Sequence, residues 1–503
     1  MSFSVLTTIL SLTSLLPLLF LIIQHHYKTP RIKFGPPTYP IIGCIISFYH
    51  NRRRLLHWYT DLLSISPSNT IVITRLGSCR TIITANPQNV EYILKSNFHN
   101  YPKGHKFTEI LGDFLGTGIF NADGKLWSSQ RKLASHDFSA KTLKEFVFKV
   151  LEDEIENRLI PYLISTAKTG QVIDFQELMT RLGFDIICRV SLGFDPDCLD
   201  LSNPPPPLLV SFDNAAASSA IRGAAPIQII WKIKKLLNMG TERNLRDSVG
   251  AIHVSINEII QKRKREKLAG GDRNDLLSRM LDAGMDDDMA RDMAISFLMA
   301  GKDTTSAALT WLFWLLTCHR DVETGIVREL SSASAEKKKN MDFEDIKNMD
   351  FLKACLCETM RLYPPVAWDS KHAGDRDLLP DGTVVYKGDR VTYFPYGMGR
   401  MEELWGKDRL EFRPDRWFVE PNGGEMKKVS PYVYPIFQAG PRVCLGKEMA
   451  FIQMKYVAAS ILRRFEVFPA AAQKKIPIFV PLLTAHMLGG FQVNICEKEQ
   501  PLV

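Results

Sequence analysis

The chain has 503 residues, 45% of them hydrophobic and 23% charged, which allows a large buried core and excludes a disordered protein. Its formal net charge of +8 comes from the N-terminus, because residues 1–60 contain six Lys or Arg and no Asp or Glu. Subtracting these from the 63 basic and 55 acidic residues leaves 57 against 55, so no nucleic-acid-binding surface is expected. The nine cysteines form no Cys-x-x-Cys pair, and their odd number predicts reduced thiols in the cytosol rather than a disulfide framework.

A charge-free stretch at residues 3–23 is long enough to cross a membrane, which takes about 20 apolar residues. The alternative is a buried core helix. It fits less well because the stretch is N-terminal and is followed by Lys28, Arg31 and Lys33, which the positive-inside rule keeps in the cytosol. The predicted parts of the chain are therefore a single transmembrane anchor at residues 1–27, a proline-rich hinge at residues 28–40 and a cytosolic folded domain at residues 41–503.

The domain at residues 41–503 is predicted to be mainly α-helical with a small β-rich part. Alternating patterns broken by turn residues predict two β-hairpins, at residues 71–84 and 383–394, and further strand is expected within residues 469–493. Helical periodicity predicts helices at residues 126–138, 143–163, 247–267, 290–318, 351–362 and 447–457.

Trp127 and Arg131 lie one turn apart on the helix predicted at residues 126–138. Their indole N–H and guanidinium would face the same way and suit an anionic group such as a carboxylate. Taken alone, such a pair more often belongs to the surface of an amphipathic helix, where the arginine extends into solvent.

The helix predicted at residues 290–318 is apolar nearly all round but carries Gly301, Lys302, Asp303 and Thr304 at its middle. A membrane location is disfavoured, because Lys or Asp at a membrane-helix centre costs about 2.5–3.5 kcal/mol. The Thr304 hydroxyl can bond back to the carbonyl four residues earlier and open a groove over a cofactor, which makes Asp303 a candidate proton relay. A structural kink without catalytic role explains these residues alone equally well.

Glu358 and Arg361 stand three residues apart on the helix predicted at residues 351–362. An exposed ion pair at this spacing stabilises a helix by only about 0.2–0.5 kcal/mol and would not indicate a functional role. Downstream, Arg416 in a Pro-Asp-Arg-Trp segment could complete a buried charge network with them. Such a network would be architectural and would hold the loop described next.

Residues 437–446 place a lone cysteine in a loop of two glycines, a proline and an arginine, directly before the helix predicted at residues 447–457. A thiolate near neutral pH requires positive charge, which the arginine and the N-terminus of that helix are expected to supply. The glycines permit close backbone approach, and the phenylalanine ring forms a dry wall. Without the other motifs, a structural half-buried cysteine would be the more usual explanation. The candidate site residues of this loop are Phe437, Gly440, Arg442, Cys444 and Gly446.

Together, these four motifs match in order and spacing those of the cytochrome P450 family of haem-thiolate monooxygenases, which the chain resembles from its predicted anchor to its end. The resemblance implies that Cys444 is the axial ligand of haem b iron and that Asp303 and Thr304 deliver protons. The propionate contacts that it implies are Trp127, Arg131, Arg442 and, after a Trp-Asp-Ser segment, Lys371. The structural network that it implies is Glu358, Arg361 and Arg416.

The resemblance also implies the partners and the location. The sequence carries no Gly-x-Gly-x-x-Gly fingerprint or flavin domain, so electrons from NADPH would arrive through a membrane-bound NADPH-cytochrome P450 reductase. This reductase is expected to dock near Lys132 and Lys447 on the cysteine side. The protein is expected in the endoplasmic reticulum membrane as a single-pass protein with its catalytic domain in the cytosol.

Three segments, at residues 121–136, 364–372 and 437–440, resemble the plant group that oxidises chain ends. This implies hydroxylation at the terminal or near-terminal carbon of a long apolar substrate such as a fatty acid or jasmonoyl-isoleucine, or else at the side-chain end of a hydroxylated sterol. The expected pocket walls are residues 107–120, Phe297, Ala300, residues 366–368 and residues 482–484.

Two other classes of haem-thiolate protein are alternatives to a monooxygenase. An oxygen-independent haem-thiolate isomerase or dehydratase usually lacks the acid and threonine found at Asp303 and Thr304, and a membrane haem sensor without turnover would not need a groove in a core helix. Neither class would consume NADPH.

Overall fold

The computed structural model describes residues 35–139, 141–225, 227–271, 273–333, 341–420, 424–471 and 476–499. The predicted anchor at residues 1–27 lies outside the described residues, as does the first part of the predicted hinge. Among the described residues, no helix is both long enough and apolar enough to span a membrane.

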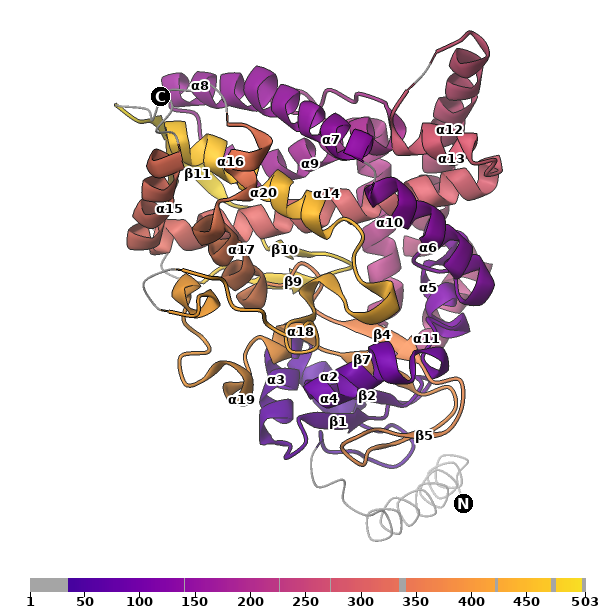
Figure 1. Ribbon diagram of the computed structural model, residues 1–503. Helices are drawn as coiled ribbons and strands as arrows, with labels where there is room; N and C mark the ends of the chain where they lie inside the picture. The colour runs from indigo at the N-terminus through magenta and orange to yellow at the C-terminus, as the bar shows by residue number, and fades with distance from the viewer. Residues whose placement is uncertain are drawn as a thin grey trace, which may run out of the picture.

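Helices make up most of the protein and surround one long central helix, α14 (Asp287–Cys318) (Figure 1). The Asp286 side chain accepts the Met289 N–H and so fixes where this helix begins. The other helices are α2 (Ile45–Asn51), α3 (Leu55–Ile65), α4 (Pro87–Glu91), α5 (His105–Leu115), α6 (Gly124–Ser139), α7 (Lys141–Glu154), α8 (Ile160–Thr169), α9 (Phe175–Leu192), α10 (Pro207–Ala224), α11 (Gln228–Leu236), α12 (Thr241–Leu268), α13 (Leu276–Asp282), α15 (Arg320–Ala333), α16 (Phe343–Lys347), α17 (Asp350–Leu362), α18 (Pro395–Met398), α19 (Glu402–Trp405) and α20 (Lys447–Arg464).

The predicted mainly helical character is confirmed, and five of the six predicted helices fall within α6, α12, α14, α17 and α20. Residues 143–163 are helical as predicted, but not as one regular α-helix. A π-helical turn at Ile155–Leu159 separates α7 from α8. Pro161 stands at the start of α8, where its missing N–H cannot continue the α-helical hydrogen-bond ladder.

The main sheet has the strand order β1 (Thr70–Ile73), β2 (Thr81–Thr84), β7 (Arg390–Tyr393), β4 (Asp369–His372). The β1–β2 pair is antiparallel and confirms the first predicted hairpin. The β2–β7 pair is parallel and the β7–β4 pair antiparallel. In Figure 1 this sheet and helices α2–α4 form a layer below the helical body.

The second predicted hairpin, at residues 383–394, is wrong in its pairing. β6 (Val384–Val385) pairs with β5 (Asp377–Leu378), whereas β7 joins the main sheet. The turn between β6 and β7 does exist, with Gly388 at a φ of 82°. The Asp389 carboxylate accepts the Tyr386 N–H and pairs with Arg80, which directs β7 towards β2 instead of back along β6.

The C-terminal region supplies the further strand that was expected. β9 (Phe479–Pro481) pairs with β10 (Ala485–Met487), and β11 (Gln492–Glu497) lies between β3 (Ile173–Asp174) and β8 (Phe465–Pro469).

Helices α9 and α14 are in unusually close contact at the centre of the protein. A Cβ added at Gly183 would lie 2.8 Å from the Lys302 carbonyl oxygen, and one added at Gly301 would lie 2.5 Å from the Ile187 side chain. The Ser306 hydroxyl crosses the interface and donates to the Met179 carbonyl at 2.7 Å. These contacts fix the position of the middle of α14.

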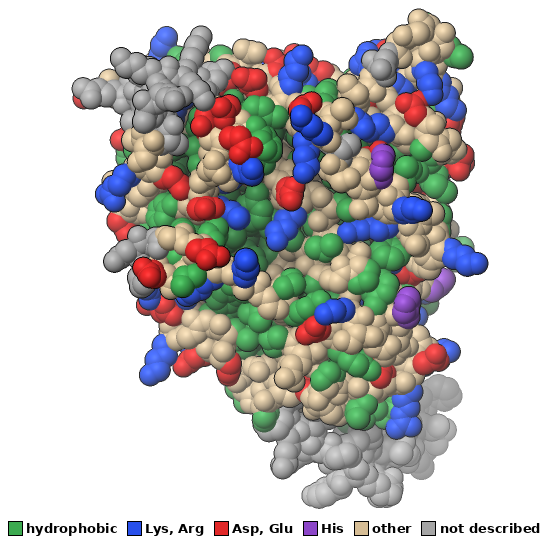
Figure 2. Space-filling view, in the orientation of Figure 1, with side chains coloured by type: hydrophobic (Ala, Val, Ile, Leu, Met, Phe, Trp, Pro, Cys, Tyr) green, Lys and Arg blue, Asp and Glu red, His purple; other side chains and the backbone are tan. Residues whose placement is uncertain are grey.

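Acidic and basic side chains are intermingled over the face shown in Figure 2, with apolar side chains between them. This distribution accords with the near-neutral charge balance of the chain beyond residue 60.

Candidate active site

A cavity of about 1160 Å³ lies between α14, the main sheet and the loop at residues 437–446. Each of the expected pocket walls contributes to its lining. The apolar lining residues from those walls are Phe107, Ile110, Leu111, Leu115, Ile119, Phe120, Phe297, Ala300, Val366, Ala367, Trp368, Leu482 and Leu483.

The structure brings most of the candidate site residues to this one cavity. Those that line it are Trp127, Arg131, Thr304, Lys371, Phe437, Arg442, Cys444 and Gly446. Those that do not line it are Asp303, Glu358, Arg361, Arg416 and Gly440.

The cysteine loop is held by its own backbone and by close packing. The Cys444 N–H donates to the Phe437 carbonyl at 2.8 Å, which closes the loop. Gly440 has a φ of 65°, and a Cβ there would lie 2.0 Å from the Leu94 carbonyl oxygen. Glycine is therefore required at this position, whereas the nearest atom to a Cβ at Gly446 would be 3.8 Å away.

The Cys444 side chain is exposed, and the space it faces is the cavity inside the protein. Burial raises the pKa of the Cys444 thiol, while the Gly446 N–H and the positive charges of Arg131 and Lys447 act in the opposite direction. The expectation that Arg442 faces the sulfur is wrong. Its Nη2 bonds to Asp123 Oδ1 at 2.7 Å and to a carbonyl at 2.9 Å, and this partner turns it away from the thiol.

A second group of charges lies where β4 borders the cavity. Lys103 Nζ and Lys371 Nζ donate to the two oxygens of Asp369, at 2.7 and 3.0 Å. Although burial alone would raise the pKa of Asp369, the two lysines hold it well below its usual range. The Tyr393 hydroxyl and the Gln438 amide also donate to Asp369, at 3.1 and 3.2 Å, which joins the sheet to the cysteine loop.

Around Cys444 the charges do not balance. With Lys371 protonated, four cations (Lys103, Arg131, Lys371 and Arg442) stand against two carboxylates (Asp123 and Asp369), which leaves two positive charges over. Burial lowers the pKa of Lys371 to about 7, and an anionic ligand beside this lysine would keep it charged. Arg442 Nε is buried and has no hydrogen-bond partner among the described residues, and the guanidinium of Arg442 lies 4.5 Å from the centre of the Trp127 ring. A buried group of this kind needs a ligand acceptor. The residues therefore fit a cofactor that carries two carboxylates, as the two propionates of haem do.

Sequence reasoning missed Lys103, because no motif spacing marks the segment Pro102-Lys103-Gly104. It becomes a site residue only through its contact with Asp369, 266 positions away in the chain.

The middle of α14 forms the groove that was expected. Thr304 Oγ1 donates to the Ala300 carbonyl at 2.7 Å, and both residues line the cavity. Asp303 differs from the expectation. It pairs with the buried Lys302, which also donates to Asp213 on α10 at 2.7 Å. These partners draw the Asp303 carboxylate away from the cavity.

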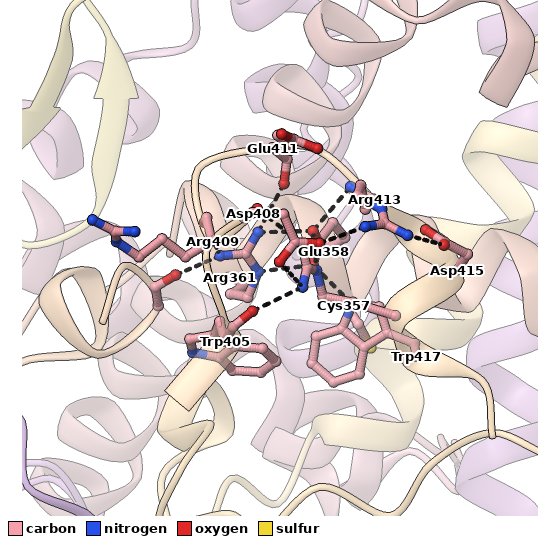
Figure 3. A network of polar contacts seen from close by, with 12 residues as sticks. Cys357, Glu358, Arg361, Trp405, Asp408, Arg409, Glu411, Arg413, Asp415 and Trp417 are labelled. Atoms are coloured by element: carbon pink, nitrogen blue, oxygen red, sulfur yellow. Dashed lines mark hydrogen bonds and ion pairs between the residues drawn. The ribbon is translucent and has the colours of Figure 1, made fainter. Parts of the chain in front are cut away.

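Glu358 and Arg361 are both fully buried (0% exposed) and lie at the centre of a polar network (Figure 3). Arg416 joins this network through its ion pair with Glu358. Arg361 donates to both carboxylate oxygens of Glu358, at 2.7 and 2.8 Å, and Arg416 Nε donates at 2.8 Å. Two donors that the sequence did not suggest complete the set, Trp417 Nε1 and the Arg413 N–H, each at 3.0 Å.

This network joins α17 to the segment that precedes the cysteine loop. Arg361 also donates to the carbonyls of Arg409 and Glu411, at 2.5 and 3.0 Å. The Tyr434 hydroxyl donates to the carbonyl of Cys357 on α17 at 2.8 Å. Its ring centre lies 4.8 Å from that of Trp417. The chain that enters the loop is therefore tied to α17.

A cysteine exposed to an apolar cavity, beside surplus positive charge for a dicarboxylate cofactor, is the arrangement that a haem-thiolate protein requires. Comparison with known proteins gives the family: residues 34–492 match Cytochrome P450, and the chain belongs to this family. It is therefore a haem-thiolate monooxygenase, whose cofactor is haem with a cysteine thiolate ligand.

The chain is 55% identical to Cytochrome P450 94B1 of Arabidopsis thaliana over 97% of each chain. It is also 55% identical to Cytochrome P450 94B3 of the same plant over 93% of each, and 45% identical to Cytochrome P450 94A1 of Vicia sativa over 92% of this chain and 91% of that one. The crystal structure of the cytochrome P450DA heme domain shares the fold, with a TM-score of 0.78 at 20% identity, over 93% of this chain and 98% of that one.

Proposed function

We propose that the protein hydroxylates the terminal or near-terminal carbon of a long apolar substrate with a carboxylate at its other end, such as a fatty acid or jasmonoyl-isoleucine. One observation carries this proposal, namely the charge of the cavity lining. Its walls near Cys444 are apolar, and Asp369 is the only carboxylate among the described residues that line it. The lining cations are Arg52, Arg53, Arg54, Arg75, Lys103, Arg131, Lys371, Arg390, Arg400 and Arg442.

This lining favours an anionic substrate over a neutral sterol. A cation without a counter-charge loses solvation when a neutral ligand displaces water, whereas a carboxylate compensates that loss. Four of the cations lie far in sequence from the cysteine loop: Arg52, Arg53 and Arg54 form the short 3-10 helix after α2, and Arg75 stands in the turn after β1. The anionic end of the substrate would lie towards them and the apolar end towards Cys444.

In this proposal, the thiolate of Cys444 would hold the haem iron. Trp127, Arg131, Lys371 and Arg442, together with Lys103, would hold the propionates. When bound, haem would supply the chemistry that activates dioxygen with two electrons from outside and inserts one oxygen atom into a C–H bond. Gly440 fixes the loop against its neighbouring turn, and the Phe437 ring would form a dry wall beside the sulfur.

Thr304 would position the proton that the reaction consumes. Its hydroxyl hydrogen is committed to the Ala300 carbonyl, so its lone pairs remain free to accept from a water in the cavity. Asp303 would act behind Thr304 in the path of the proton. Its ion pair with Lys302 keeps the carboxylate beside the groove but outside the cavity.

A redox partner supplies the electrons, and we propose that it is the NADPH-dependent reductase, docking near the exposed Lys132 and Lys447. The single-pass anchor at residues 1–27, the hinge at residues 28–40 and the endoplasmic reticulum location belong to the same proposal. The charge-free stretch at residues 3–23 supports them.

The test is incubation of the full-length protein with reductase, NADPH and a panel of long-chain fatty acids, jasmonoyl-isoleucine and hydroxylated sterols. Mass spectrometry should find one added oxygen at or next to the chain terminus of the acids. Mid-chain products would contradict the proposal. Product formed by the protein alone, without NADPH, would instead indicate an isomerase or dehydratase.

A further inference from the structure

The Asp369 carboxylate stands at the start of β4, beside a cavity whose lining is otherwise strongly cationic. Its two oxygens accept from Lys103 Nζ and Lys371 Nζ, from a backbone N–H at 2.9 Å and from two neutral side chains. A carboxylate this close to a site for anions repels the ligand that the site is meant to hold. Its presence there therefore needs a physical reason.

The two lysines that Asp369 holds are almost without solvent. Lys371 is 1% exposed and Lys103 is 6% exposed. An ammonium group carries three N–H donors, and in the part of the chain that the structure describes each of these two uses one, on Asp369. Both side chains line the cavity, so the remaining donors are available to a propionate of the cofactor.

Lys371 holds its proton only weakly. Burial lowers its pKa to about 7, and the positive charges of Lys103 and Arg442 act in the same direction. The Asp369 carboxylate, 3.0 Å from the Lys371 Nζ, acts against them. The charge of this lysine therefore depends on one neighbour.

The other titratable groups around Lys371 cannot replace Asp369. The Tyr393 hydroxyl stays neutral, because burial raises its pKa well above the usual value. Asp123 already pairs with an arginine of the cysteine loop. His372, the next residue on β4, is also neutral, because burial lowers its pKa to about 4. Without Asp369, the Lys371 ammonium would face only positive charge in a site without solvent and would lose its proton.

We propose that Asp369 is a positioning residue of the cofactor site: it keeps Lys371 charged and holds the two ammonium groups where a propionate of haem binds. Asp369 repels the propionate, but it gives the site a full positive charge that Lys371 would otherwise lose. An arginine would not need such a partner, since a guanidinium stays protonated in proteins. This inference rests on the proposed function, which assigns Lys103 and Lys371 to the propionates.

The test measures how tightly the full-length protein holds haem, by equilibrium partition of the cofactor against apomyoglobin at pH 6 and pH 8, read by absorbance. Only ratios between variants are compared, so the pH responses of the competitor and of the thiolate cancel. Asp369→Asn removes the charge and keeps the shape. Its affinity relative to the unaltered protein should fall by about a further tenfold from pH 6 to pH 8, because Lys371 then loses its proton at a lower pH. A residue with a structural role alone would weaken binding by the same factor at both pH values.

Two comparisons assign the effect to Lys371. In the Lys371→Arg background, Asp369→Asn should change the affinity by the same factor at both pH values, because arginine keeps its charge. Lys371→Arg alone should gain about tenfold over the unaltered protein from pH 6 to pH 8, and this comparison does not require Asp369→Asn to fold. Asp375→Asn is the matched control. It removes an exposed carboxylate that pairs with Lys387, and its affinity should equal that of the unaltered protein at both pH values.

A loss of affinity in Asp369→Asn that is the same at both pH values would overturn the proposal. A pH-dependent loss that persists in the Lys371→Arg background would overturn it as well, and so would a Lys371→Arg affinity that follows pH as the unaltered protein does. Failure of the proposed function would appear separately, as products oxidised away from the chain terminus, whatever the haem affinities.

Discussion

Glu358→Gln is expected to destabilise the protein strongly, because this one carboxylate accepts five hydrogen bonds in a site without solvent. Arg361 supplies two of them, and one each comes from Arg416, Trp417 and the Arg413 backbone. Glutamine has the same shape but turns an NH₂ group towards two of these donors and leaves two guanidinium groups with a neutral partner. Breaking a buried ion pair from one side costs about 3–5 kcal/mol.

The assay is denaturant unfolding of the purified protein, read by fluorescence, together with the haem content of the folded fraction. The control is Glu344→Gln, which removes an exposed partner of Lys347 on α16 and should cost less than about 1 kcal/mol. A loss below about 1 kcal/mol for Glu358→Gln, with normal haem content, would refute the view that this network holds the cysteine loop.

Three further predictions follow from the site. Cys444→Ala should abolish the red-shifted carbon monoxide band of the reduced protein; a band that persists would disprove the ligand assignment. With Thr304→Ala, NADPH consumption should continue while hydroxylated product falls and peroxide rises, and unchanged coupling would argue against a role in proton delivery. Lys103→Met should move the acid unfolding midpoint to higher pH. The depressed pKa of Asp369 stabilises the fold above about pH 4, and this stabilisation is lost as the pH falls, so it shrinks when one of the two lysines is removed. An unchanged midpoint would show that Asp369 does not depend on Lys103.

The sequence predicted well those parts of the site whose contacts join residues of one short segment. The back-bond of Thr304 joins residues four apart on one helix, and the cysteine loop lies within ten residues. Helical periodicity and turn residues act over the same short range, which is why the central helix and the first hairpin were predicted correctly.

The failures have a common physical origin in contacts between distant segments. β7 follows a proper turn but pairs with β2, about 300 positions earlier. Asp303 stands on the predicted helix, yet Lys302 and its partner Asp213 on another helix decide where its carboxylate points. Local spacing gives no information on such partners, so Lys103 could not be found from the sequence and Arg442 was assigned the wrong neighbour.

The close contact between α9 and α14 has a consequence for how this cavity can change its shape. A Cβ added at Gly183 or Gly301 would lie less than 3 Å from a carbonyl oxygen or an isoleucine side chain. The wall of the cavity formed by α14 therefore has no free space in which to bend or to accept a larger residue. Accommodation of a longer or bulkier substrate is therefore expected from walls outside this contact, such as those that α5 and α10 supply. Engineering of substrate range should start with those helices and leave the central one untouched.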